Sequence, residues 1–173
     1  LYRCQVEDLQ PLAGMPLIRL RISSRQVRDC GPLQGMPLTS LDLSYCTQIQ
    51  DFTPLTGLPL TVLHLNACQI RALQQPLGLQ LTEVSLAGTR VRDIERLKGK
   101  PLKKLALHRT AVTDLTPLQG MELEEIFLTP KNITQGLNHL RDMQSLKTIG
   151  IGYASTEKWP AAEFWDHYDK EEF

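Results

Sequence analysis

The hydrophobic residues of this sequence follow one pattern that recurs along most of the chain. The pattern is L-x-x-L-x-L, with Leu, Ile or Val at three fixed places. It begins at Leu17, Leu38, Leu60, Leu81, Leu102, Leu123 and Leu146, in steps of 21, 22, 21, 21, 21 and 23 residues. In each copy the last two apolar positions alternate with other residues, which is the two-residue period of a strand buried on one face. Each copy therefore predicts one short strand.

The second half of each unit is equally regular and reads V-x-D-L-x-P-L-x-G in its best copy, residues 112–120. An aspartate recurs at Asp8, Asp29, Asp51, Asp93 and Asp114. We expect its carboxylate to accept hydrogen bonds from free backbone N–H groups at the start of a tight turn or 3₁₀ segment. Prolines at Pro11, Pro32, Pro54 and Pro117 suit a segment too short for a full helix. Glycines able to reverse the chain follow at Gly14, Gly35, Gly57, Gly99 and Gly120.

Strands of this length cannot bury their own leucines, so the units must stack side by side. The sequence predicts an α/β solenoid in which the strands form one parallel sheet and the turns form the opposite wall. We expect residues 1–152 to form the array, as a partial first repeat plus seven strand units of about 21 residues. Residues 153–173 are expected to form a C-terminal cap.

The run L-x-x-L-x-L-x-x-[TC]-x-[VI]-x-D-L-x-P-L-x-G resembles a leucine-rich repeat of the short, internalin-like bacterial type. This resemblance covers residues 1–152 and implies a right-handed superhelix, with a parallel sheet on the concave face and 3₁₀ or short turns on the convex face. Residues 102–121 and 123–136 further look like repeat arrays of large multidomain bacterial proteins, some of which also carry a serine/threonine kinase domain. That closer resemblance implies a recognition arm of a larger protein.

The sequence departs from the repeat pattern at two places. The position that is usually Asn holds Arg25, Cys68, Thr89 and Thr110 in four of the repeats. Thr and Cys can replace part of the hydrogen bonding of Asn to loop backbone. In the third repeat, Ala72 stands at the aspartate position and Pro76 is displaced by one residue, which predicts a local irregularity.

The two ends of the chain differ from the central repeats. Leu1, Cys4 and Val6 fit the tail of a preceding repeat, so we expect a larger parent protein to continue upstream. Residues 134–143 have apolar positions spaced by three, which predicts a true helix in place of a 3₁₀ segment. Residues 159–168 combine a proline suited to a helix start with aromatic residues that could cover an exposed core. We expect Trp159 and Trp165 to seal the solenoid, with a partner-binding anchor as the alternative.

Composition and charge remove several classes of protein. With 42% hydrophobic and 22% charged residues, the chain is expected to fold as an ordinary soluble domain. Lys+Arg at 19 balances Asp+Glu at 19, so neither nucleic acid nor a membrane surface is an expected partner. Apolar runs fall short of the ~18 to 20 residues of a membrane span, and no signal peptide is recognisable. The chain is expected to be a monomer, and a cytoplasmic location is favoured.

Neither the cysteines nor the histidines form a motif for metal binding or catalysis. Cys4, Cys30, Cys46 and Cys68 occupy repeat positions held elsewhere by apolar residues or Thr, so we expect reduced, buried thiols. A disulfide between neighbouring repeats and a metal or redox role are the alternatives. His64 and His108 are expected to project from the strands about 10 Å apart, too far for one zinc ion. We predict no cofactor, no metal, no catalytic residue and no enzymatic activity.

The residues between and beside the strand leucines are the informative ones, because every repeat contributes them to a single surface. Glu83, Lys104 and Glu125 form an alternating charge ladder, for which solvated cross-strand pairing is the simplest interpretation. The candidate binding residues on the concave face are Arg21, Tyr45, His64, Asn66, His108, Arg109 and Phe127. They predict a non-catalytic module that binds a protein or peptide. A structural spacer or regulatory arm of a larger protein, such as a serine/threonine kinase, is the alternative.

Overall fold

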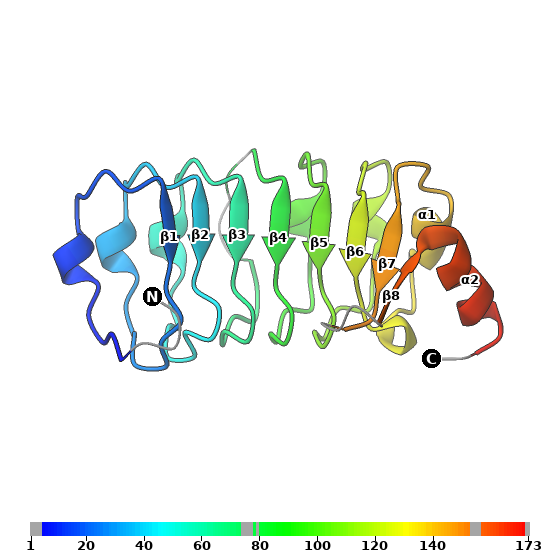
Figure 1. The fold of residues 1–173 in the computed structure, drawn as a ribbon, viewed down its shortest axis with the longest axis horizontal. Helices are drawn as coiled ribbons and strands as arrows, with labels where there is room; N and C mark the ends of the chain where they lie inside the picture. The colour runs from blue at the N-terminus through cyan, green and yellow to red at the C-terminus, as the bar shows by residue number, and fades with distance from the viewer. Residues whose placement is uncertain (1–4, 74–77, 79, 153–156, 172–173) are drawn as a thin grey trace.

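The repeats fold into seven parallel strands that form one sheet along the length of the molecule (Figure 1). The computed structural model of the chain describes residues 5–73, 78, 80–152 and 157–171. The strands are β1 Arg19–Arg21, β2 Ser40–Asp42, β3 Val62–His64, β4 Glu83–Ser85, β5 Lys104–Ala106, β6 Glu125–Phe127 and β7 Thr148–Gly150. Each strand pairs with the next one in the chain, and equivalent repeat positions lie opposite each other. The strand pattern and its register are as predicted.

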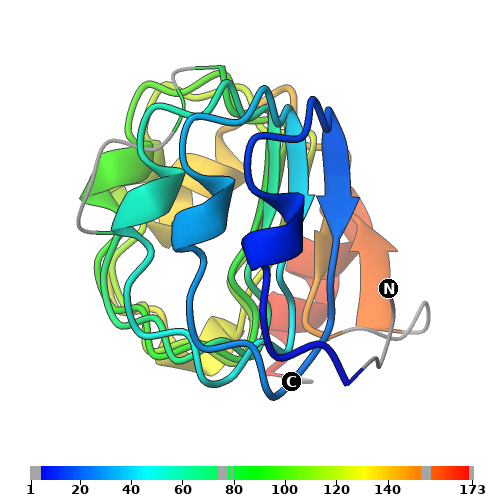
Figure 2. The same cartoon turned by 90° about the vertical axis from the view of Figure 1, so that its left-hand side faces the viewer.

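Short 3₁₀ helices lie on the side of the molecule opposite the sheet (Figure 2). They are η1 Gln10–Leu12, η2 Gly31–Leu33, η3 Thr53–Leu55, η4 Glu95–Leu97 and η5 Thr116–Leu118. A further 3₁₀ helix, η6 Pro130–Asn132, comes soon after β6 and lies at the lower end of the molecule (Figure 2). The recurring aspartates accept a hydrogen bond from the backbone N–H two residues later, at 2.7 Å for Asp8, Asp29, Asp93 and Asp114 and at 2.8 Å for Asp51. This confirms the predicted capping role. The chain then turns through a glycine with positive φ, such as Gly120 at 73°.

The core runs without interruption between the sheet and the 3₁₀ helices. Leucines of the repeat pattern, such as Leu41, Leu63 and Leu105, are at most 1% exposed and belong to a single hydrophobic cluster. Full burial of one such side chain stabilises the fold by about 1.5 to 3 kcal/mol. Because each leucine packs against the repeats on both sides, the stability of each unit depends on its neighbours.

The position that usually holds Asn works as predicted where Thr or Cys occupies it. The Thr89 hydroxyl donates to the Leu86 carbonyl at 2.6 Å, and the Cys68 thiol donates to the Leu43 carbonyl of the preceding repeat at 3.2 Å. Arg25, which stands at this position in the first repeat, is exposed. Its neighbour Ser24 is buried instead and donates to the Val6 carbonyl at 2.6 Å.

The helix predicted in the last repeat is present as α1 Leu137–Arg141 and precedes β7. Beyond β7 the direction of the chain reverses. Strand β8 Lys158–Pro160 pairs antiparallel with β7, and helix α2 Ala161–Asp169 follows it directly. The helix start at the proline was predicted, whereas β8 was not.

Aromatic side chains of the C-terminal segment pack against the end of the core. Phe164 is fully buried, and Trp159, Trp165 and Tyr168 contact the hydrophobic cluster. The division into an array and a separate cap stays a prediction.

Other sequence predictions lie in part outside the described residues. Ala72 is exposed, but residues 74–77 and 79, which include Pro76, are not described. The proposed tail of a preceding repeat depends on Leu1 and Cys4, which are not described either. Within the described ranges, no helix is both long and apolar enough to cross a bilayer.

Candidate functional site

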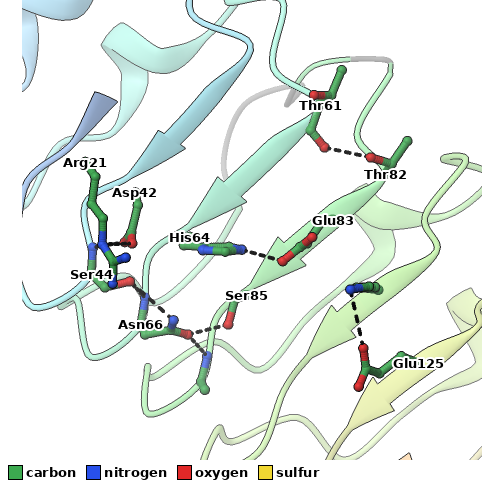
Figure 3. Close-up of polar contacts among 12 residues, drawn as sticks. Arg21, Asp42, Ser44, Thr61, His64, Asn66, Thr82, Glu83, Ser85 and Glu125 are labelled. Atoms are coloured by element: carbon green, nitrogen blue, oxygen red, sulfur yellow. Dashed lines mark hydrogen bonds and ion pairs between the residues drawn. The ribbon is translucent and has the colours of Figure 1, made fainter. Parts of the chain in front are cut away.

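The side chains that point away from the core on β1 to β7 and in the turns just after them form one surface, which we call the strand face. Its columns follow the register of the sheet, so that Arg21, Asp42, His64, Ser85, Ala106, Phe127 and Gly150 are consecutive neighbours. Figure 3 shows the middle of this surface and the polar contacts across it. Several predicted binding residues are already engaged with their neighbours there.

Asn66 connects three neighbouring repeats. Its amide nitrogen donates to the Ser44 hydroxyl at 3.2 Å. Its amide oxygen accepts from the Ser85 hydroxyl at 2.5 Å and from the Ala87 backbone N–H at 2.9 Å (Figure 3). Because both ends of the amide are bonded within the protein, Asn66 holds the ends of β2, β3 and β4 in register. Its first role is therefore to order the surface.

Charged side chains pair along the strand face. Arg21 Nε lies 3.0 Å from Asp42 Oδ2, and His64 Nε2 lies 2.8 Å from Glu83 Oε1 (Figure 3). In the predicted charge ladder, Lys104 pairs with Glu125 at 3.7 Å, whereas Glu83 is engaged by His64. Exposed pairs of this kind contribute about 0 to 1 kcal/mol each to stability. They serve mainly to fix the positions of the side chains.

His108 lies on the strand face and lines its pocket, but the residue is covered by its neighbours and is only 2% exposed. Its ring meets that of Phe127 edge-on, with 5.9 Å between the ring centroids. Burial, with a smaller effect of the neighbouring Arg109 charge, lowers the pKa of His108 below its ordinary value of 6.5, while Glu157 acts in the opposite direction. The buried imidazole is therefore stabilised in its neutral form.

Phe127 is half-buried, although the sequence suggested an exposed ring. It packs over Gly150 on one side, and Lys158 Nζ lies 5.7 Å from its ring centroid. The β7–β8 hairpin thus supports the ring, and this element was not predicted.

Tyr45 and Arg109 lie in the turns after β2 and β5, where each adopts a positive φ, 67° and 56° respectively. Tyr45 is 42% exposed, and Arg109 is also exposed. The Arg109 backbone N–H donates to the Thr129 hydroxyl at 2.8 Å, which anchors its turn to the next repeat. Both side chains are placed at the margin of the strand face.

A pocket of about 340 Å³ opens on the strand face. It brings together four of the predicted residues, His64, Asn66, His108 and Phe127, and leaves out Arg21, Tyr45 and Arg109. Other residues also line the pocket, and they were not among the predicted binding residues. They are Glu83, Val84, Ser85, Lys104, Leu105, Ala106, Glu125 and Gly152. A sequence signal existed for the pocket, because the small Ser85 and Ala106 fall between the larger His64 and Phe127 in one column.

The cysteines lie away from this pocket, inside the solenoid. Cys30, Cys46 and Cys68 are buried, and Cys4 lies outside the described residues. Burial raises the pKa of the Cys30 and Cys68 thiols to about 12. No group of three His, Cys, Asp or Glu side chains is arranged to hold a metal ion in the part of the chain that the structure describes.

Comparison with known proteins identifies the architecture. No protein-family model matches the sequence, and no curated protein is significantly similar to it. Among solved structures, internalin C2 from Listeria monocytogenes superposes with a TM-score of 0.75 at 24% sequence identity, over 88% of this chain and 69% of that protein. Another internalin from the same organism, inlF, gives a TM-score of 0.72 at 22% identity, over 86% of this chain and 52% of that protein.

These likenesses confirm the predicted fold. The chain is an internalin-like leucine-rich repeat solenoid, with a sheet that is parallel except at β8 and with 3₁₀ turns on the opposite side. It spans about half the length of the second internalin.

Proposed function

We propose that this chain is a non-catalytic module that binds a protein or peptide through its strand face. The main support is the pocket of about 340 Å³ on that face, where side chains from neighbouring repeats converge. An array of this kind gathers affinity from several repeats, because each repeat adds side chains to one continuous surface. The internalin-like fold is consistent with such a role.

The contacts within the strand face would favour binding by ordering it in advance. The pairs Arg21–Asp42 and His64–Glu83, together with the bonds of Asn66, restrict side chains that would otherwise lose rotamer freedom on association. Ordering of a flexible side chain at an interface costs about 0.5 to 1.5 kcal/mol. A surface ordered in this way binds through shape and hydrogen-bond complementarity.

The balanced charge of the chain favours a protein or peptide over nucleic acid, since a basic surface is the usual footprint of a nucleic-acid-binding protein. We further propose that the module acts as a monomer and needs no cofactor.

One observation favours a different role, that of a structural spacer or regulatory arm of a larger bacterial multidomain protein such as a serine/threonine kinase. Several charged groups of the strand face are paired with each other, so part of this surface is satisfied without a partner. In that case the rigid solenoid would position a neighbouring domain.

The two roles are distinguished by capture of partners from a bacterial lysate on the wild-type chain and on two triple variants. The strand-face variant carries Arg21→Ala, His64→Ala and Lys104→Ala. The opposite-face control carries Glu95→Ala, Lys98→Ala and Gln119→Ala, all at exposed positions on or beside the 3₁₀ helices. Asn66 and His108 are left unchanged because their contacts support the fold, and circular dichroism checks that all three proteins are folded.

Recognition through the strand face predicts a partner that the wild type and the control retain and that the strand-face variant loses. A partner that the strand-face variant retains and the control loses would contradict the proposal. If no partner is recovered, the spacer role is favoured.

A further inference from the structure

The pocket on the strand face has a simple physical origin in one column of the sheet. Strands β4 and β5 contribute Ser85 and Ala106 to this column, whereas their outer neighbours contribute His64 and Phe127. Two small side chains between two rings leave a hollow that is two strands wide. Its volume of about 340 Å³ lies at the lower end of the ~300 to 1,000 Å³ typical of ligand sites. The hollow is therefore suited to one long side chain of a partner.

Both rings that border the hollow are held in place. His64 is fixed by its contact with Glu83 at 2.8 Å. Phe127 is supported from behind by the β7–β8 hairpin, where Gly150 leaves room for the ring and Lys158 lies near its face. The hollow therefore does not depend on a ligand to form its walls.

The two carboxylates at the rim differ in how their charges are balanced. Glu125 contacts two lysines, Lys104 at 3.7 Å and Lys158 through a hydrogen bond. Among the described residues, the Glu83 carboxylate pairs with one side chain, that of His64. With a neutral imidazole, this pair keeps a net charge of −1. The Glu83 side chain is 35% exposed, so its charge is accessible from the hollow.

We propose that this hollow receives an arginine side chain of a protein or peptide partner. The guanidinium would donate hydrogen bonds to the Glu83 carboxylate and lie between the rings of His64 and Phe127. Arginine fits better than lysine, because its planar group matches a carboxylate, stacks on aromatic faces and is less strongly hydrated than an ammonium group. This inference rests on the proposed function and names the chemistry that the strand face recognises.

The test uses small probes in place of a partner. The wild-type chain is titrated with N-acetyl-arginine amide and with N-acetyl-citrulline amide, which has nearly the same shape but no charge. Binding is followed by the NMR shift of the Ala106 methyl group at about pH 8, where histidine side chains are generally neutral. The arginine probe should produce a saturable shift at Ala106, and the citrulline probe should bind about tenfold more weakly. The absence of a saturable shift, or equal binding of both probes, would overturn the proposal.

Two variants locate the interaction. Glu83→Gln keeps the shape of the side chain and an oxygen that can accept from His64, so the sheet should stay intact while arginine binding falls about tenfold. The control Glu122→Gln removes an exposed carboxylate that pairs with Lys103 away from the pocket, and binding should not change. Equal binding to wild type and Glu83→Gln would also overturn the proposal. The citrulline comparison uses only the wild-type chain, so it holds even if a variant fails to fold.

Failure of this inference can be told apart from failure of the proposed function. If the arginine probe does not bind at Ala106 but the triple strand-face variant loses a partner, the strand face is still the recognition surface. Only the arginine specificity of the hollow is then wrong. If the probe binds but no partner depends on the strand face, recognition of proteins through this face is wrong.

Discussion

Phe127 on β6 lies directly over Gly150 on β7, its partner in the register of the sheet. A Cβ atom at position 150 would overlap the edge of the Phe127 ring. Because Gly150 has no side chain, the neighbouring strand can carry the large Phe127 ring at the same level of the sheet. This relationship sets one wall of the pocket.

Replacement of Gly150 by Ala should displace the ring and destabilise the fold. Overpacking of this kind costs about 1 to 3 kcal/mol, measurable as a change in the free energy of unfolding in urea. In a Phe127→Ala background the same replacement should cost much less, because the atoms that it overlaps are gone. An equal cost in both backgrounds would show that the ring and the glycine are not coupled.

The aspartate caps should each support the 3₁₀ turn that they begin. Asp114 accepts from the Thr116 backbone N–H at 2.7 Å, so Asp114→Ala should measurably lower the free energy of unfolding. Asp166 lies exposed on α2 and serves as the matched control. Its replacement by Ala should cause no loss. The free energy of unfolding of both variants is measured by chemical denaturation. Similar free energies for the two variants would refute the capping role.

Acid should weaken the same turns. Hydrogen bonds from the side chain and backbone of Thr53 lower the pKa of Asp51 below 3.8, and bonds from the backbone and side chain of Thr116 do the same to the pKa of Asp114. A carboxyl with a lower pKa in the folded state contributes its stability in full above pH 3.8. That contribution is lost as the pH falls from 3.8 through the folded pKa.

The acid response can be measured as the urea midpoint at several pH values. The wild-type midpoint should fall in this range, and a variant with Asp51→Asn and Asp114→Asn should show a shallower decline. Identical slopes for the two proteins would mean that these carboxyls do not contribute.

The buried thiols should be unreactive while the chain is folded. Burial raises the pKa of Cys30 and Cys68 to about 12, so the thiolate that reacts with disulfide reagents is scarce as well as inaccessible. In a Cys4→Ser background, a thiol-reactive chromogenic disulfide should label the native chain very slowly and the urea-unfolded chain rapidly. Rapid labelling of the native chain would contradict the burial of these residues.

The same shift has a consequence at high pH. Because the folded pKa of these thiols lies above the ordinary value of 9.0, their contribution to stability is complete below pH 9.0. It should be lost as the pH rises from 9.0 towards 12.

The repeat pattern was enough to predict the strands, their register and the caps, because these features depend on contacts between equivalent positions of neighbouring units. Leu41, Leu63 and Asp114 have the same surroundings as their counterparts one repeat away. A regular pattern therefore determines regular contacts.

The C-terminal hairpin lacked such a signal. Strand β8 forms from Lys158, Trp159 and Pro160, which show no alternation typical of a strand, and its pairing depends on the position of β7. The burial of His108 and Phe127 could not be predicted for a related reason, since the Phe127 ring lies over Gly150 of β7 and the His108 ring packs against Phe127. The contact between His64 and Glu83 could not be predicted either, because the column pattern does not determine which of several charged neighbours pair with each other.

Recognition through the strand face is tested most directly by the footprint of a captured partner on the methyl groups of the chain. Val62, Ala106 and Thr148 report on the strand face, whereas Thr53 and Thr116 report on the 3₁₀ side. Binding through the strand face predicts that NMR signals of the first three methyl-bearing residues shift or broaden on addition of the partner while those of the two threonines on the 3₁₀ side stay unchanged. Changes confined to Thr53 and Thr116 would contradict it.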